Sequence, residues 1–164
     1  TLFGFEKYEV IPDILCIAKG MGGGMPIGAF ISSWELMNLL TFNPKLGHIT
    51  TFGGHPVNCT ASLACLQYLL TTDIMGQVDK KEQLFRTHLV HSKIISIRGK
   101  GLMLAIELED EELTKKVVGK CLEDGLILFY FLFTKTAIRI TPPLTISDNE
   151  IIDGCETIKR ILKT

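Results

Sequence analysis

The chain has 164 residues, of which 46% are hydrophobic and 21% charged, and its formal net charge at pH 7 is −1. This composition is sufficient for a packed core and is unlike that of a disordered chain. The near-zero charge argues against a nucleic-acid partner, and no apolar run reaches the ~18 uncharged residues of a membrane span, so neither kind of partner is expected.

The five cysteines are scattered along the chain, and neither they nor the four histidines have the spacing of a zinc site. An odd number of cysteines without a paired motif is typical of reduced thiols. We therefore expect an intracellular protein, of the cytoplasm or the mitochondrial matrix, that binds no metal.

The first informative stretch is a pair of apolar segments joined by a glycine-rich turn. Residues 14–18 form a continuous apolar run, which predicts a buried strand of a parallel sheet. Lys19 ends this run, and four glycines follow within the next five positions. A second strand is predicted over residues 27–32.

Lys19 is the first candidate catalytic residue. A buried ammonium is costly, and a buried lysine can avoid that cost by staying unprotonated. An unprotonated, desolvated amine is a nucleophile that condenses with a carbonyl to form a Schiff base. A lysine that caps a strand and points to water, followed by a simple turn, explains the same residues. A Walker loop and a dinucleotide-binding loop do not fit, because Gly20 follows the lysine and Met25 stands where a third glycine is needed.

Two helices follow. The first is predicted over residues 34–40, with Ser33 as its N-cap. A polar stretch then leads into a largely buried helix that begins at Pro56, where the missing N–H costs nothing. The hydroxyls of Thr50 and Thr51 precede this helix, and a helix N-terminus favours a phosphate. N-capping by either threonine, without any ligand, is the alternative.

The pattern changes near Asp73, where we place a boundary between a first domain, residues 1–73, and a second domain, residues 74–164. The second domain is predicted to alternate helices over residues 75–89, 111–123 and 148 onward with strands over residues 94–98, 102–108, 126–133 and 137–141. Ser147 is predicted to cap the last helix in a capping box with Glu150.

Arg139 is the second candidate functional residue. It alternates with Ile138 and Ile140 in a predicted strand that ends at a double proline. A planar guanidinium can hold a carboxylate through two parallel hydrogen bonds, which would suit a substrate clamp. A surface ion pair at a strand edge is the alternative.

Four segments carry a family resemblance that covers essentially the whole chain. They are Pro12-Asp13-Ile14-Leu15 with Ala18-Lys19-Gly20-Met21-Gly22-Gly23-Gly24-Met25-Pro26-Ile27-Gly28-Ala29, Thr50-Thr51-Phe52-Gly53-Gly54-His55-Pro56, Arg98-Gly99-Lys100-Gly101-Leu102-Met103, and Ile138-Arg139-Ile140-Thr141-Pro142-Pro143-Leu144. In this order they resemble the class III aminotransferases that use pyridoxal phosphate, and among these the ornithine and acetylornithine aminotransferases.

The resemblance implies an α/β fold, in which residues 1–73 are the end of a fold-type I large domain and residues 74–164 a small α+β domain. It implies that Lys19 holds pyridoxal 5'-phosphate as a Schiff base and moves a proton at the substrate Cα. Thr51, with Thr50, would bind the cofactor phosphate across the interface of a homodimer, and Arg139 would bind the substrate α-carboxylate.

The implied reaction passes the amine of an ornithine-like donor (ornithine, acetylornithine or 4-aminobutyrate) to 2-oxoglutarate. Relatives with the same lysine loop include an aminomutase, a racemase and a decarboxylase. A non-catalytic α/β interaction module is the alternative from a different functional class.

The chain departs from the family at His55, where asparagine is usual. The family's pyridine-nitrogen aspartate, aromatic ring stacker and glycine-rich phosphate loop lie upstream of Thr1, and Asp13 does not match that aspartate. We therefore expect a fragment that lacks the amino-terminal half, binds the cofactor poorly and does not turn over alone.

Overall fold

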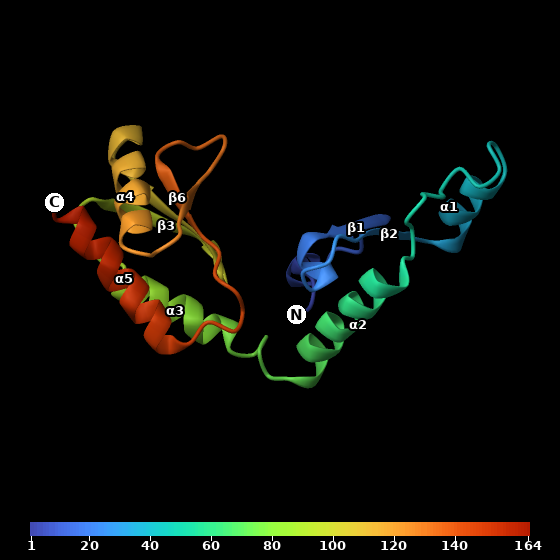
Figure 1. The fold of residues 1–164 in the computed structure, drawn as a ribbon, viewed down its shortest axis with the longest axis horizontal. Helices are drawn as coiled ribbons and strands as arrows, with labels where there is room; N and C mark the ends of the chain where they lie inside the picture. The colour runs from blue at the N-terminus through green and yellow to red at the C-terminus, as the bar shows by residue number, and fades with distance from the viewer. The chain divides into compact units, whose positions relative to one another are not determined.

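The computed structural model describes all 164 residues, which divide into two compact units, Thr1–Met75 and Gly76–Thr164. Figure 1 labels the main elements of both units. None of the helices combines the length and the apolar character that crossing a bilayer would require.

The first unit contains a two-stranded sheet, one long helix and several short helical turns. Its elements are η1 (Gly4–Tyr8), β1 (Ile14–Ala18), η2 (Lys19–Gly22), β2 (Gly28–Ser32), α1 (Trp34–Asn38), η3 (Leu39–Thr41) and α2 (Pro56–Thr71). The two predicted strands and both predicted helices are confirmed, with α1 shorter than predicted. The Ser33 hydroxyl caps α1 as predicted, accepting from the Leu36 N–H at 3.4 Å.

The two strands of the first unit pair antiparallel, from Ile14 opposite Ser32 to Ala18 opposite Gly28. The predicted parallel arrangement is wrong for this pair. Parallel neighbours need a crossover of a dozen or more residues, whereas the short connection after Lys19 simply reverses the chain.

Side chains of the first unit are mostly exposed, and its only buried residues are Gly22 and Ile74. The strand β1 alternates exposed and partly exposed residues, and α2 has no buried residue. The predicted burial of both elements is therefore wrong in this chain. A single strand pair and one helix cover too little apolar surface to enclose either element.

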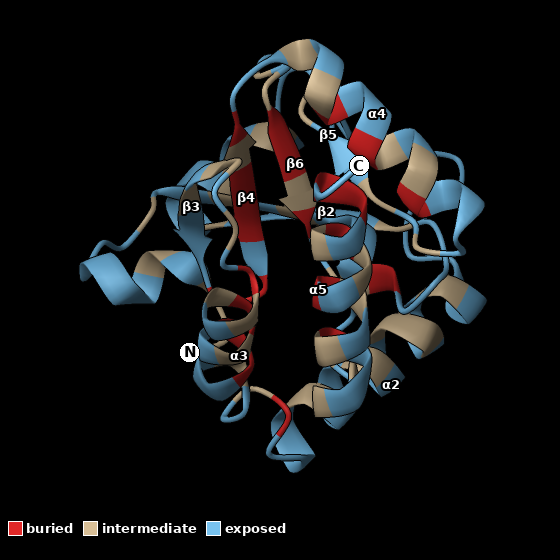
Figure 2. Ribbon diagram, turned by 90° about the vertical axis from the view of Figure 1, so that its left-hand side faces the viewer, coloured by how far each residue is buried: buried red, intermediate tan, exposed pale blue.

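The second unit packs three helices on one face of a four-stranded antiparallel sheet. Its elements are α3 (Val78–His88), β3 (Ile94–Lys100), β4 (Met103–Leu108), α4 (Glu111–Glu123), β5 (Phe129–Tyr130), β6 (Ala137–Ile140) and α5 (Asp148–Leu162). The strand order is β3-β4-β6-β5, so β4 and β6 are central. Figure 2 shows burial concentrated on these two strands and on the helices.

The core of the second unit follows the alternation of β4 and β6. Ile106 and Ile138 are 0% exposed and lie in one hydrophobic cluster with residues of all three helices. The helices contribute Phe85, Val117, Cys121, Ile151, Cys155, Ile158, Ile161 and Leu162 to it, and Leu89, directly after α3, also belongs to it. The intervening strand residues, including Glu107 and Arg139, therefore lie on the opposite face of the sheet.

In this unit, the helices are predicted well from local sequence patterns, whereas the strand over residues 126–133 is not. The capping box at α5 is confirmed, since the Ser147 hydroxyl accepts from the Glu150 N–H and the Glu150 carboxylate accepts from the Ser147 N–H. The strand predicted over residues 126–133 is wrong in length, because only Phe129 and Tyr130 pair with β6. The segment before them continues the end of α4 instead, with the Leu126 N–H donating to the Cys121 carbonyl at 2.7 Å.

A buried ionic network, which the sequence did not predict, holds the turn between β3 and β4. The Glu82 carboxylate accepts from the Gly101 N–H at 2.6 Å and from Arg86 Nε at 3.0 Å, and it pairs with Lys100 Nζ at 3.1 Å. Arg86 also donates to the Gly99 carbonyl at 2.9 Å. Burial raises the pKa of Glu82, but the hydrogen bonds from Gly101, Lys100 and Arg86 outweigh it, and the pKa lies below its usual range.

Candidate active site

Lys19 lies where β1 ends and η2 begins. Its φ of +55° places a non-glycine residue in the left-handed region, which is uncommon and energetically unfavourable. The side chain is exposed and has no hydrogen-bond or ion-pair partner. The predicted burial of Lys19 is therefore wrong in this chain, because the two-stranded sheet leaves the strand end open. The amine is accessible to an aldehyde from solvent.

The turn after Lys19 packs against α2. Gly23 has a φ of +57°, and a Cβ there would lie 2.9 Å from the Ala61 carbonyl oxygen, so no larger residue fits without a shift. The Asn58 side chain donates to the Pro26 carbonyl at 2.6 Å. These contacts fix the glycine-rich turn to the helix. At Gly23, the close approach of the backbone therefore serves packing against α2.

Thr50 and Thr51 are exposed in the turn that precedes α2. Pro56 is the first residue of the helix, as predicted, and His55 is the N-cap. No side chain caps this end, so N-capping by either threonine is excluded. The first N–H groups of a 16-residue helix therefore remain available to an anion.

Arg139 is the central charged residue of β6. Its guanidinium carbon lies 5.2 Å from the centre of the Phe129 ring, in a cation–π contact across the β5–β6 pair. Its Nε is buried and has no hydrogen-bond partner. No carboxylate pairs with Arg139, so the alternative of a surface ion pair is wrong. A buried donor without an acceptor is unfavourable until a ligand supplies one.

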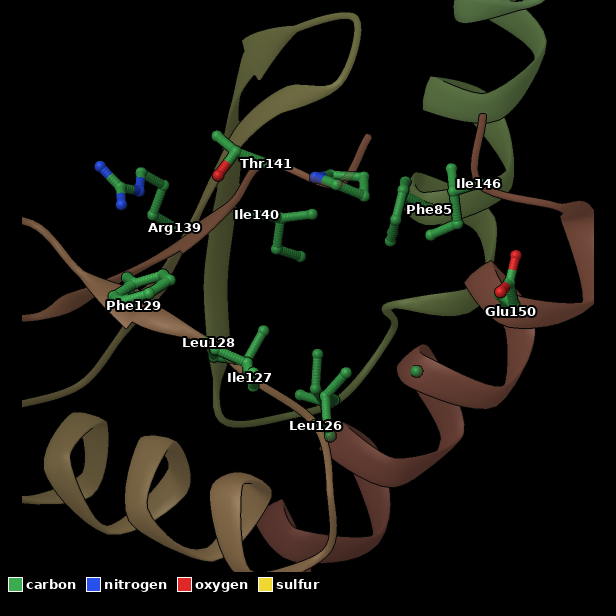
Figure 3. A pocket seen from close by; sticks show the side chains of 13 residues that line it. Phe85, Leu126, Ile127, Leu128, Phe129, Arg139, Ile140, Thr141, Ile146 and Glu150 are labelled. Carbon is green, nitrogen blue, oxygen red and sulfur yellow. The ribbon is translucent and has the colours of Figure 1, made fainter. Parts of the chain in front are cut away.

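Arg139 also lines a cavity of about 130 Å³ within the second unit. The rest of the lining is mostly apolar and comes from α3, α5, β5 with the segment before it, and β6 with the segment after it. Figure 3 shows the guanidinium beside Phe129 and on the other side of the cavity from Phe85 and Ile146. The guanidinium thus lies at one end of the cavity, and Phe85 and Ile146 form its apolar opposite end (Figure 3).

The predicted site residues fall in two groups. Lys19, Thr50 and Thr51 belong to the first unit and Arg139 to the second. No hydrogen bond joins Lys19 to either threonine. The contact of Phe129 with Arg139 was missed by the sequence analysis, because it depends on which strands pair and in what register.

Comparisons with known proteins point to one family. The family model described as "Aminotransferase class-III" matches residues 1–162. An acetylornithine aminotransferase from Caldanaerobacter subterraneus subsp. tengcongensis is 37% identical over 98% of this chain and 40% of its own length. The chain therefore spans about 40% of the length of this curated relative.

Solved structures agree with the sequence match. An aminotransferase from Bacillus anthracis superposes with a TM-score of 0.86 at 30% identity, over 98% of this chain and 41% of its own. An ornithine aminotransferase from Toxoplasma gondii, described with partial occupancy of PLP at its active site, gives 0.84 at 29% identity over 99% of this chain and 39% of its own. The expected α/β fold of this enzyme class is confirmed.

Proposed function

Since this chain belongs to the class III aminotransferase family, we propose that it is part of a pyridoxal-phosphate-dependent aminotransferase. Residues 1–73 would then end the cofactor-binding large domain, and residues 74–164 would form the small domain. The observation that supports this most strongly is the match over residues 1–162. It includes an exposed, unpartnered lysine directly before its glycine-rich loop.

The residues of the first unit fit pyridoxal phosphate. Lys19 offers an accessible amine without a competing partner, as an aldehyde requires. The uncapped N-terminus of α2, preceded by the Thr50 and Thr51 hydroxyls, offers hydrogen-bond donors to a phosphate. No carboxylate of the chain pairs with the Lys19 amine, and no side chain caps the N-terminus of α2, so both remain available to the cofactor.

When bound, pyridoxal phosphate supplies a reactive aldehyde and an electron sink. Lys19 Nζ would hold that aldehyde covalently and, once released by the substrate amine, would take the proton from the substrate Cα as a general base. Thr51, with Thr50, would hold the phosphate of a cofactor shared across a homodimer interface. Arg139 would bind the substrate α-carboxylate, giving its buried Nε the acceptor that it lacks.

We propose an ornithine-like donor, namely ornithine, acetylornithine or 4-aminobutyrate, with 2-oxoglutarate as acceptor. The relatives above named acetylornithine and ornithine aminotransferase support this choice. Measuring amine transfer from each donor, with the protein isolated from its host, tests it. Transfer from none of the three would contradict the donor proposal without touching the role of Lys19.

The role of Lys19 is tested by adding excess pyridoxal phosphate to the chain and recording the visible absorbance of a lysine–aldehyde adduct. We expect Lys19→Ala to abolish most of this absorbance. Lys45→Ala is the matched control, since Lys45 is also an exposed lysine of the first unit. Equal absorbance in the two variants would contradict the proposal. The lack of this absorbance both in the chain and in the protein isolated from its host would favour the interaction module.

A further inference from the structure

The face of the second unit's sheet that is turned away from the helices carries two arginines in one cross-strand row. Arg98 of β3 lies opposite Ala105 of β4, and Ala105 lies opposite Arg139 of β6. Directly opposite residues in an antiparallel sheet point to the same face. The small Ala105 side chain therefore leaves room between the two guanidinium groups.

The carboxylate of this face belongs to Glu107. In β4, Glu107 is two residues from Ala105, and it lies opposite Ala137, which is two residues from Arg139. Glu107 and Arg139 are thus diagonal neighbours on one face, with Cα atoms roughly 7–8 Å apart in such a pair. Two long side chains can close that separation, so an ion pair between them is sterically within reach.

In the structure, each oxygen of the Glu107 carboxylate accepts a hydrogen bond from a residue other than Arg139. Arg98 Nη2 donates to Glu107 Oε2 at 2.6 Å, and the Thr136 hydroxyl donates to Oε1. These hydrogen bonds, Thr136 first and Arg98 second, lower the pKa of Glu107, so the carboxylate is ionised at neutral pH. Meanwhile the buried Nε of Arg139 lacks an acceptor.

We propose that Arg98, with Thr136, holds the Glu107 carboxylate away from Arg139 and so keeps Arg139 free to bind a carboxylate ligand. Arg98 is then a positioning residue that acts through Glu107. Without it, an internal carboxylate competes with the ligand for the same guanidinium. The inference rests on the proposed function only for the identity of that ligand as a substrate.

The test uses the ¹⁵N-labelled 164-residue chain and the Nε–H resonance of Arg139, identified by its loss in Arg139→Lys. We expect Arg98→Ala to shift this resonance in the absence of ligand, and Arg98→Ala/Glu107→Gln to restore it. In a titration with propionate, the dissociation constant should rise roughly fivefold in Arg98→Ala, as for a strong partly exposed ion pair, and return close to the original value in the double variant.

Arg160→Ala is the matched control, because Arg160 also forms an exposed ion pair, with Asp124, but lies in α5. An unshifted Nε–H in Arg98→Ala, or a shift that the double variant does not reverse, would overturn the proposal. Failure of propionate to bind Arg139 in the unaltered chain would instead refute its carboxylate role. The ligand-free resonance would still decide the role of Arg98, independently of the Lys19 experiment.

Discussion

Glu82 is the buried carboxylate through which α3 holds the β3–β4 turn. Its removal would leave the Gly101 N–H and Arg86 Nε without their acceptor. Unsatisfied buried donors cost about 1–3 kcal/mol each. We therefore expect Glu82→Ala to lower the free energy of unfolding by at least about 2 kcal/mol, measured by urea denaturation. Glu123→Ala, an exposed carboxylate without a partner, should change it little.

The same carboxylate makes stability depend on pH. Because the folded pKa of Glu82 lies below the unfolded value of about 4.3, ionised Glu82 stabilises the fold above that pH. This stabilisation is lost as pH falls through the folded pKa. Glu82→Gln should therefore show a shallower loss of unfolding free energy between neutral and acidic pH than the unaltered chain. An identical pH profile in both would contradict the account of this network.

Lys19 and Arg139 were recognisable from the sequence as candidate functional residues, but the residues that surround them were not. Lys19 was recognisable because one lysine interrupts an apolar run before four glycines. Its exposure was not predictable, since burial of a strand end depends on the strands and helices that surround it. The aromatic partner of Arg139 was equally hidden, because Phe129 faces it only through the β5–β6 register.

At the scale of elements, two glycines of the second unit differ in whether the backbone and its neighbours would accept a side chain. Gly99, near the end of β3, has a φ of +110°, and a Cβ there would lie 2.1 Å from the Met103 carbonyl oxygen. Gly119 lies within α4, where an added Cβ would have no heavy atom within 4 Å. A side chain at Gly99 would therefore clash with the backbone, whereas a side chain at Gly119 would fit without a clash.

We expect Gly99→Ala to destabilise the second unit by more than about 2 kcal/mol, through strain and steric clash. Gly119→Ala should instead stabilise it by about 0.5–1 kcal/mol, because alanine restricts the unfolded chain and favours the helix. Thermal unfolding followed by circular dichroism gives both values. A higher melting temperature for Gly99→Ala than for Gly119→Ala would contradict the backbone conformation described at Gly99.

The ends of helices were the most predictable features, because capping residues and turn-forming residues near each end determine them. The range 111–123 and the Ser147–Glu150 capping box were both predicted from a few neighbouring residues and are confirmed. The strand predicted over residues 126–133 failed because apolar character alone does not fix pairing. Only Phe129 and Tyr130 meet the edge of β6, so only they form a strand.

At the scale of the whole molecule, the two units differ in how well they bury side chains, and the native cysteines report this difference. Cys16 and Cys59 of the first unit are exposed, whereas Cys121 and Cys155 of the second are 0% exposed. Burial raises the pKa of Cys121 to about 11 and that of Cys155 to about 12. Thiolates at these two positions are therefore scarce and shielded at neutral pH.

We expect a brief pulse of iodoacetamide to alkylate Cys16 and Cys59 in the native chain but to spare Cys121 and Cys155. All four should react after unfolding in urea. Mass spectrometry of the digested chain gives the extent of labelling at each site. Native labelling of Cys121 or Cys155 at the rate of Cys16 would show that the second unit lacks the packed core described here.

The most direct test of the central claim is borohydride reduction of the protein as isolated from its host, followed by digestion and mass mapping of the pyridoxyl group. The chain has other exposed lysines, including Lys45 and Lys135, which serve as internal controls. We predict that the label lies on Lys19. A pyridoxyl group on any other lysine, with none on Lys19, would contradict the assignment.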